Sequence, residues 1–134
     1  MEKIEEKEFI KKHINYKKVI DEKGNSAAHI AAERYPEFLA AFPPDWEGWG
    51  WENKENKTVA YIAARFNPQL LAAFPASWEG WGWKNCYGTT VAHIIAQYLP
   101  QLLSAFPPDW PGWSWEREKN ITVLQDFYNN VINK

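Results

Sequence analysis

A chain of 134 residues is long enough for one domain with a sizeable core, but too short for two independent domains of ordinary size. Its hydrophobic fraction of 46% and aromatic fraction of 16% exclude an intrinsically disordered chain. The formal net charge of −2 gives no strong field that would attract nucleic acid or an anionic membrane, so we expect neither as a partner.

Cysteine usage and the N-terminal residues together predict a cytoplasmic protein. Cys86 is the only cysteine, so no internal disulfide can form, which favours a reducing compartment. Met1 is followed by charged residues rather than by the apolar run of a signal peptide. No uninterrupted apolar stretch approaches the roughly 18 residues that a membrane-spanning helix requires.

Residues 1–23 are expected to form an N-terminal helical cap. Ile4, Phe9, Ile10 and Ile14 lie at helical spacing, and lysine and acidic residues occupy most of the remaining positions. The ends of a repeat array must be closed with polar surface. We therefore interpret the charged residues of this segment as the solvated face of a cap rather than as a basic binding surface.

Beyond this cap, one tryptophan-rich phrase recurs at a fixed spacing of 32 residues. It begins at Phe42, Phe74 and Phe106, and the three copies contain all nine tryptophans. A strict period of this size indicates a repeat array, in which each unit buries its apolar face only against its neighbours. The predicted units are 24–55, 56–87 and 88–119.

The same register predicts two helices in each unit. A Gly or Asn suited to positive φ comes two residues before a Ser or Thr suited to cap a helix, and an apolar run follows. The turn positions are Gly24, Asn56, Gly88 and Asn120, and the caps are Ser26, Thr58, Thr90 and Thr122. A proline ends each of the first three runs and can begin a short second helix, at Pro36, Pro68 and Pro100. The tryptophan phrase then forms the connection to the next unit.

The last segment, 120–134, is expected to form a closing helix. Apolar residues recur along it at helical spacing and are predicted to face inward. They are Val123, Leu124, Phe127, Tyr128, Val131 and Ile132.

The apolar runs resemble a known repeat family. Residues 24–32, 56–64 and 88–96 resemble the G-x-T-P-L-H-x-A-A signature of ankyrin repeats, and the resemblance covers roughly residues 21 to 130. The signature proline is replaced in all three units, the second helix is about a turn too short, and the tryptophan phrase is not an ankyrin feature. We expect an all-α fold, a short ankyrin-like α-solenoid of helix-turn-helix repeats with Trp-rich connecting loops; another two-helix solenoid is the alternative.

The residues that could carry chemistry do not converge on one site. His29 and His93 share a repeat column, and the resemblance implies that a histidine there hydrogen-bonds the backbone of the neighbouring turn. Cys86 lacks the base and the orienting group that a catalytic thiol needs, and no phosphate-binding glycine loop is present. We expect no catalytic residue, no cofactor and no metal, and an enzyme that uses His93 with Cys86 is the least favoured alternative.

The tryptophans admit two interpretations. They could present aromatic faces to a glycan or another small ligand, or they could supply the packing that the shortened second helix cannot. The phrase scarcely changes between units, whereas a recognition site is expected to vary. We therefore predict that the tryptophans mainly pack, and carbohydrate or small-ligand binding stays as the alternative function.

Variable columns mark the expected binding residues, which lie at the end of the first helix and at the loop tips. The predicted function is non-enzymatic binding of a partner protein through the concave or loop face, as an inhibitor, immunity or effector protein would do. The predicted partner-binding residues are Glu33, Arg34, Arg65, Phe66, Gln97, Tyr98, Lys54, Tyr87 and Arg117. We expect a monomer, with end-to-end association of arrays as a further possibility.

Overall fold

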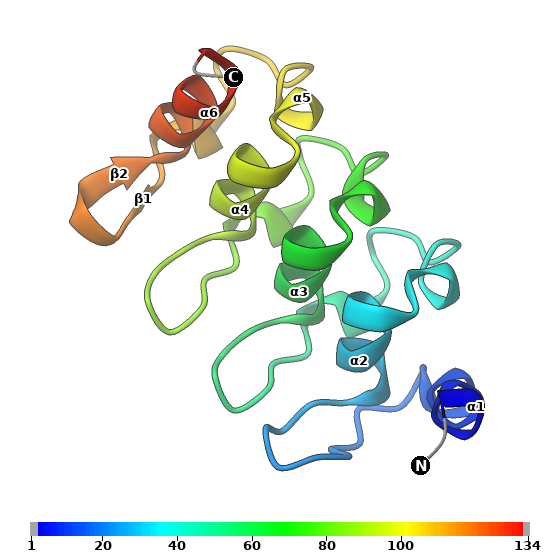
Figure 1. Ribbon diagram of the computed structural model, residues 1–134. Coiled ribbons are helices and arrows are strands. Elements are labelled where there is room, and N and C mark those ends of the chain that lie inside the picture. Colours follow the sequence, from blue (N-terminus) through cyan, green and yellow to red (C-terminus); the bar gives the residue numbers. More distant parts are fainter. Residues whose placement is uncertain (1–2, 133–134) are drawn as a thin grey trace.

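The protein is described here from a computed structural model that covers the backbone of residues 3–132 and the side chains of residues 5–131. Ile4 and Ile132, which the sequence assigned to the two caps, lie outside the described side chains. Figure 1 shows a row of units that stack side by side, with one terminal helix at each end. The α-helices are α1 (Lys3–His13), α2 (Ala27–Arg34), α3 (Val59–Phe66), α4 (Val91–Tyr98), α5 (Pro100–Leu103) and α6 (Val123–Ile132).

The predicted turns and caps are confirmed. The turn residues have φ values of 79° at Gly24, 61° at Asn56, 80° at Gly88 and 59° at Asn120. The hydroxyl of the cap residue then accepts a hydrogen bond from the backbone N–H three residues later, which satisfies a donor that the first helical turn leaves free. These bonds are His29 to Ser26, Tyr61 to Thr58, His93 to Thr90, and Gln125 to Thr122.

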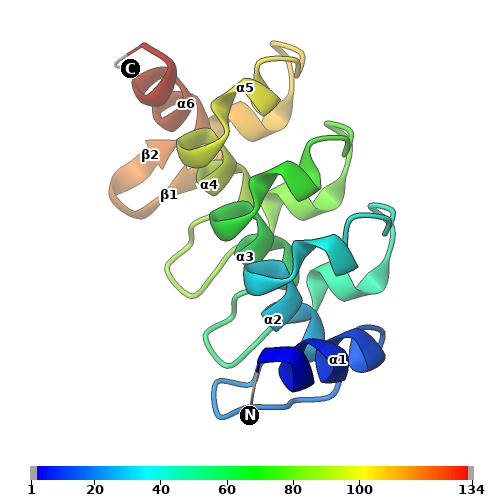
Figure 2. The ribbon, with the colours of Figure 1, turned by 45° about the vertical axis from the view of Figure 1, so that its right-hand side comes forward.

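Each predicted second helix is reduced to a single turn. It is a 3₁₀ turn at Pro36–Phe38 and at Pro68–Leu71, and one short α-helical turn, α5, in the third unit. Prolines supply the fixed φ that begins each turn, and a further proline follows within a few residues. In Figures 1 and 2 these turns lie on one side of the row of helices, and the long hairpin loops project from the other.

Small side chains allow the long helices to stack closely. Two alanines at i and i+4 on each of α2, α3 and α4 are fully buried, and each of these helices contacts the next one along the chain. A Cβ methyl there lets the neighbouring helix approach without a cavity. The residues are Ala28, Ala32, Ala60, Ala64, Ala92 and Ala96.

The tryptophan phrases fill the space beneath the shortened second helices. Each phrase contains a 3₁₀ turn, at Glu47–Gly50, Glu79–Gly82 and Pro111–Ser114. The prediction that the tryptophans mainly pack is confirmed, because none of the nine is exposed. Five are buried: Trp49, Trp51, Trp78, Trp81 and Trp110; four are half-buried: Trp46, Trp83, Trp113 and Trp115.

The first and the middle tryptophans of a phrase donate hydrogen bonds to different units. The middle indole donates to a proline carbonyl of its own unit: Trp49 to Pro43 (2.8 Å), Trp81 to Pro75 (2.7 Å) and Trp113 to Pro107 (2.9 Å). The first indole of the second and third phrases donates to the preceding unit: Trp78 to Pro44 (2.9 Å) and Trp110 to Ala76 (3.0 Å). One ring therefore stabilises its own unit, and another joins that unit to its neighbour.

The glycines of the phrase are required by these rings. A Cβ at Gly80 would come within 2.2 Å of the Trp78 ring, and Gly48 and Gly112 meet the first tryptophan of their own phrases equally closely. A Cβ at Gly82 would come within 3.2 Å of Trp115, a tryptophan of the next unit. The third phrase has Ser114 at that position, and no tryptophan of a later phrase packs on it within the described residues.

The expectation of an all-α fold is wrong, although helices dominate. The last hairpin forms a two-stranded antiparallel sheet from β1 (Glu116–Arg117) and β2 (Ile121–Thr122), in which Glu116 pairs with Thr122 and Arg117 with Ile121. The two earlier hairpins have only single bridges, Glu52 with Thr58 and Lys84 with Thr90.

A side-chain difference accounts for the extra pair. In the earlier hairpins, the side-chain oxygens of Asn53 and Asn85 accept bonds from backbone N–H groups two and four residues later, which holds the loop open. The equivalent of these asparagines in the last hairpin is Arg117, which cannot accept a bond. Consecutive positive φ values at Lys119 (67°) and Asn120 (59°) then close a tighter turn, of the kind that favours strand pairing.

The two terminal helices close the stack unequally. Ile10 of α1 and Ile14, just after this helix, are buried against the array, whereas α6 buries Val123 and half-buries Phe127. The prediction that all the apolar residues of α6 face inward is wrong for three of them. Leu124, Tyr128 and Val131 are exposed, and the first two occupy the columns in which the other units have buried alanines. No further unit follows in the described residues to cover them.

Adding a methyl group at Gly80 should destabilise the protein. The substitution Gly80→Ala places a Cβ inside the ring of Trp78, and overpacking of this kind costs roughly 1–3 kcal/mol. Urea denaturation followed by tryptophan fluorescence gives the free energy of unfolding. Ser114→Ala is the matched control and should change stability by less than about 0.5 kcal/mol; equal effects of the two substitutions would contradict the packing role of this glycine.

Candidate functional site

An arginine and two aromatic rings form an exposed cluster at the ends of two adjacent helices. The Arg65 guanidinium lies 4.7 Å from the Tyr98 ring centroid and 5.3 Å from that of Phe66. Phe66 ends α3 and Tyr98 ends α4, so the contact of these helices brings the residues together. Phe66 is 50% exposed and Tyr98 is 45% exposed. We call these three residues the Arg65 cluster.

A hollow of about 330 Å³ lies beside this cluster. Arg65 and Phe66 form one part of its lining, and Glu33 at the end of α2 forms another. Hairpin residues Asn53 and Lys57 complete the wall, so helix ends and hairpin loops share one surface. Its aromatic, cationic and anionic groups are all available to a partner, a combination typical of protein-binding surfaces.

Hydrogen bonds from two hairpin asparagines hold this surface in place. The Asn53 amide donates to the Asn25 side chain (2.9 Å), and the Asn85 amide donates to the Tyr61 hydroxyl (3.1 Å). Burial raises the pKa of Tyr61, so this hydroxyl stays protonated at neutral pH. Sequence reasoning missed the role of Tyr61 and of the asparagines, although the spacing of 32 between Asn53 and Asn85 was a usable signal.

The other predicted binding residues are dispersed. Arg34 binds Glu6 of α1 through two bonds of 3.1 Å and also lies 3.7 Å from Glu33. A hydrogen bond from Tyr35 at 2.6 Å, together with Arg34, lowers the pKa of Glu6. Lys54 and Tyr87 lie on separate hairpin loops, where Tyr87 is strongly exposed. Arg34 therefore joins α2 to α1.

Arg117 and Gln97 also make structural contacts. Arg117 forms two hydrogen bonds, of 2.8 and 2.9 Å, with the carboxylate of Asp126, which is buried in α6. This pairing raises the pKa of Arg117. Gln97 donates to the same carboxylate at 3.4 Å. Removing Arg117 would leave a buried carboxylate without its cation, so this residue stabilises the C-terminal end of the array.

The two histidines that share a repeat column act as braces between units. In His29 the Nδ1 atom accepts from the Ser26 backbone N–H (3.0 Å), and Nε2 therefore carries the proton that binds the Lys57 carbonyl at 3.1 Å. His93 contacts Thr90 and the Ile121 carbonyl in the same way. Burial lowers the pKa of both histidines, because it disfavours the charged ring.

These contacts leave neither ring nitrogen of His93 free to activate a thiol. Cys86 lies exposed on a hairpin loop, whereas His93 is fully buried. Among the described residues, no group of three His, Cys, Asp or Glu side chains is placed to hold a metal ion. In the same part of the chain, no helix has both the length and the apolar character needed to cross a membrane.

A second kind of surface occurs where consecutive tryptophan phrases meet. Two open grooves, of about 610 and 590 Å³, lie between the first and second phrases and between the second and third. Tryptophans, prolines and carboxylates line both grooves. Sequence reasoning did not single out the carboxylates Asp45, Glu47, Glu79 and Asp109 as binding residues. The recurrence of Asp45 and Asp109 after prolines suggested local capping.

The histidine braces should make stability fall on mild acidification. An unfolded histidine has a pKa of about 6.5, whereas the folded pKa of His29 and His93 is lower. Between these values the unfolded state binds more protons, so stability is full above about pH 6.5 and is lost as the pH falls. The loss is at most about 1.4 kcal/mol per histidine for each pH unit.

Urea denaturation at pH 7, 6 and 5 measures this dependence. In the double variant His29→Gln/His93→Gln, the fall in unfolding free energy should be much smaller. Gln125 shows that glutamine can make the same local cap, because its side chain accepts from the Thr122 N–H at 2.7 Å. An unchanged pH dependence in the double variant would refute the role of these rings.

The sequence matches no protein-family model, and no curated protein matches it.

Proposed function

We propose that this chain is a non-enzymatic module that binds a partner protein through the face formed by its helix ends and hairpin loops. The observation that carries this proposal is the Arg65 cluster, in which two half-exposed aromatic rings flank a guanidinium. Arginine and tyrosine are enriched among the residues that contribute most to protein interfaces. Their columns also differ between units, as a surface that selects one partner requires.

The rigidity of the surrounding surface supports this function. The hydrogen bond from Asn53 to Asn25 joins two successive loops, and the one from Asn85 joins a hairpin to Tyr61 of α3. His29 and His93 connect α2 and α4 to the next loop. A surface that is already ordered loses little conformational entropy when a partner binds. The resemblance of residues 24–32, 56–64 and 88–96 to the ankyrin signature supports the same mode of binding within an ankyrin-like repeat array.

We place the protein in the cytoplasm as a monomer that occludes its partner, as an inhibitor, immunity or effector protein does. The involvement of His29 and His93 in structural hydrogen bonds favours the absence of catalysis and of cofactors. Burial of most of the tryptophans favours protein binding over the carbohydrate alternative, because a glycan platform needs exposed aromatic faces.

Replacing the Arg65 cluster should abolish partner capture. The triple variant Arg65→Ala/Phe66→Ala/Tyr98→Ala removes exposed side chains from two helix ends, so the fold should persist while affinity falls about 100-fold or more, given that one interface hot spot contributes 2 kcal/mol or more. The measurement is quantitative capture from native lysate, followed by affinity determination with the identified partner.

Leu124→Ala/Tyr128→Ala provides the matched control, since it removes comparable exposed apolar surface from α6. This control should retain the partner. If the triple variant captured the partner as well as the unmodified protein did, the assignment of the binding face would be wrong.

A further inference from the structure

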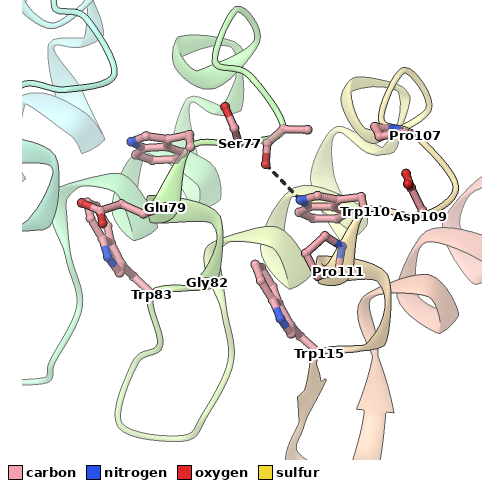
Figure 3. Close-up of a pocket in the computed structure, with 11 residues that line it drawn as sticks. Ser77, Glu79, Gly82, Trp83, Pro107, Asp109, Trp110, Pro111 and Trp115 are labelled. Carbon is pink, nitrogen blue, oxygen red and sulfur yellow. Dashed lines mark hydrogen bonds between the residues drawn. The ribbon is translucent and has the colours of Figure 1, made fainter.

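The two grooves between the tryptophan phrases form one periodic surface. Ser77, Trp78, Glu79 and Trp83 line both grooves, so the first runs into the second. Figure 3 shows the second groove, in which the indoles of Trp83 and Trp115 occupy corresponding places in successive units. The surface therefore offers similar groups at intervals of one repeat. None of its lining residues belongs to the hollow beside the Arg65 cluster.

The charge of this surface is of one sign. Asp45 and Glu47 line the first groove, Glu79 lines both, and Asp109 lines the second. These carboxylates are exposed, and none of them forms a salt bridge within the described residues. No lysine, arginine or histidine of the described chain lines either groove. Carboxylates beside indole faces are suited to a cation, which both groups attract.

The third tryptophan of each phrase also keeps a free donor. The first and middle indoles of the second and third phrases donate to backbone carbonyls. By contrast, the indole N–H groups of Trp83 and Trp115 donate to no acceptor among the described residues, and both rings are half-buried. A half-buried donor in a groove is available to a carbonyl of the occupant.

We propose that these grooves bind an extended basic segment of a protein, in the polyproline II conformation, with Lys or Arg at every third position. A polyproline II chain makes no internal hydrogen bonds, so its carbonyls are free to accept from Trp83 and Trp115. It repeats every three residues and rises about 3.1 Å per residue, which places like side chains about 9 Å apart. Packed helices lie about 8–10 Å apart, so consecutive cations meet consecutive grooves.

Neither a nucleic acid nor a neutral glycan matches these groups as well. The phosphates of a nucleic acid would be repelled by the four carboxylates. A neutral glycan would leave the carboxylates without a counter-charge. The basic segment satisfies the aromatic faces, the donors and the charges together.

Synthetic peptides test the register directly. One peptide has arginine at every third position in a proline background, and a second has the same composition with arginine at alternate positions. Tryptophan fluorescence of the full chain reports binding of both. The first peptide should bind about tenfold more tightly than the second, because only its arginines share one face of the polyproline II helix.

Charge variants test the surface itself. Glu79→Gln/Asp109→Asn should weaken binding of the first peptide about three- to tenfold, as expected for loss of two exposed ion pairs. The matched control Glu55→Gln/Glu118→Gln removes two carboxylates from hairpin loops and should leave affinity unchanged. Far-ultraviolet circular dichroism confirms that each variant is folded.

Several outcomes would overturn the proposal. These are equal affinity for the two peptides, no effect of Glu79→Gln/Asp109→Asn, or binding of a neutral oligosaccharide that the charge variants leave intact. The triple variant of the Arg65 cluster should bind the first peptide normally. The groove proposal and the proposed function can therefore fail independently.

Discussion

The constraint on which the structure depends is the missing length of the second helix. A single turn, Pro68–Leu71, packs on α3 after that helix, and the 3₁₀ turn of the first tryptophan phrase, Glu47–Gly50, contacts the same helix. Trp81 is fully buried in its own unit, while Trp78 hydrogen-bonds the preceding one. The rings meet edge to face along the array, as in the contact of Trp81 with Phe106 at 5.4 Å, which adds to the gain from burial.

Local features of the fold could be predicted from sequence because each depends on a few adjacent residues. Positive φ at Asn56 and capping by Thr58 follow from residue type, and the period of 32 transfers such predictions to every unit. The last hairpin could not be predicted, since its strands depend on the absence of an asparagine at Arg117 and on the partner that this arginine finds in Asp126. This contact joins a hairpin to a helix, so it leaves little trace in the local pattern of either segment.

The residues of the candidate surfaces, too, could be predicted from the sequence only in part. Variation between units pointed to Arg65, Phe66 and Tyr98, and the structure places these three together. The same criterion also selected Arg117, whose variation reflects a structural ion pair instead. It passed over Glu79, because the tryptophan phrase changes little between units and was interpreted as packing. Constancy is nevertheless what a ligand with its own regular period requires, so repetition alone does not separate packing from recognition.

The ends of the array determine how it can lengthen. Gly50 and Gly82 admit a tryptophan from the following unit, whereas Ser114 does not provide that space. Leu124 and Tyr128 stand where a following helix would require alanine. A unit placed after α6 would not find a surface of complementary shape to pack against. A duplicate of residues 56–87 inserted within the array would contact the same kinds of residue on both sides. Internal duplication is therefore the form of growth that keeps every contact between units unchanged.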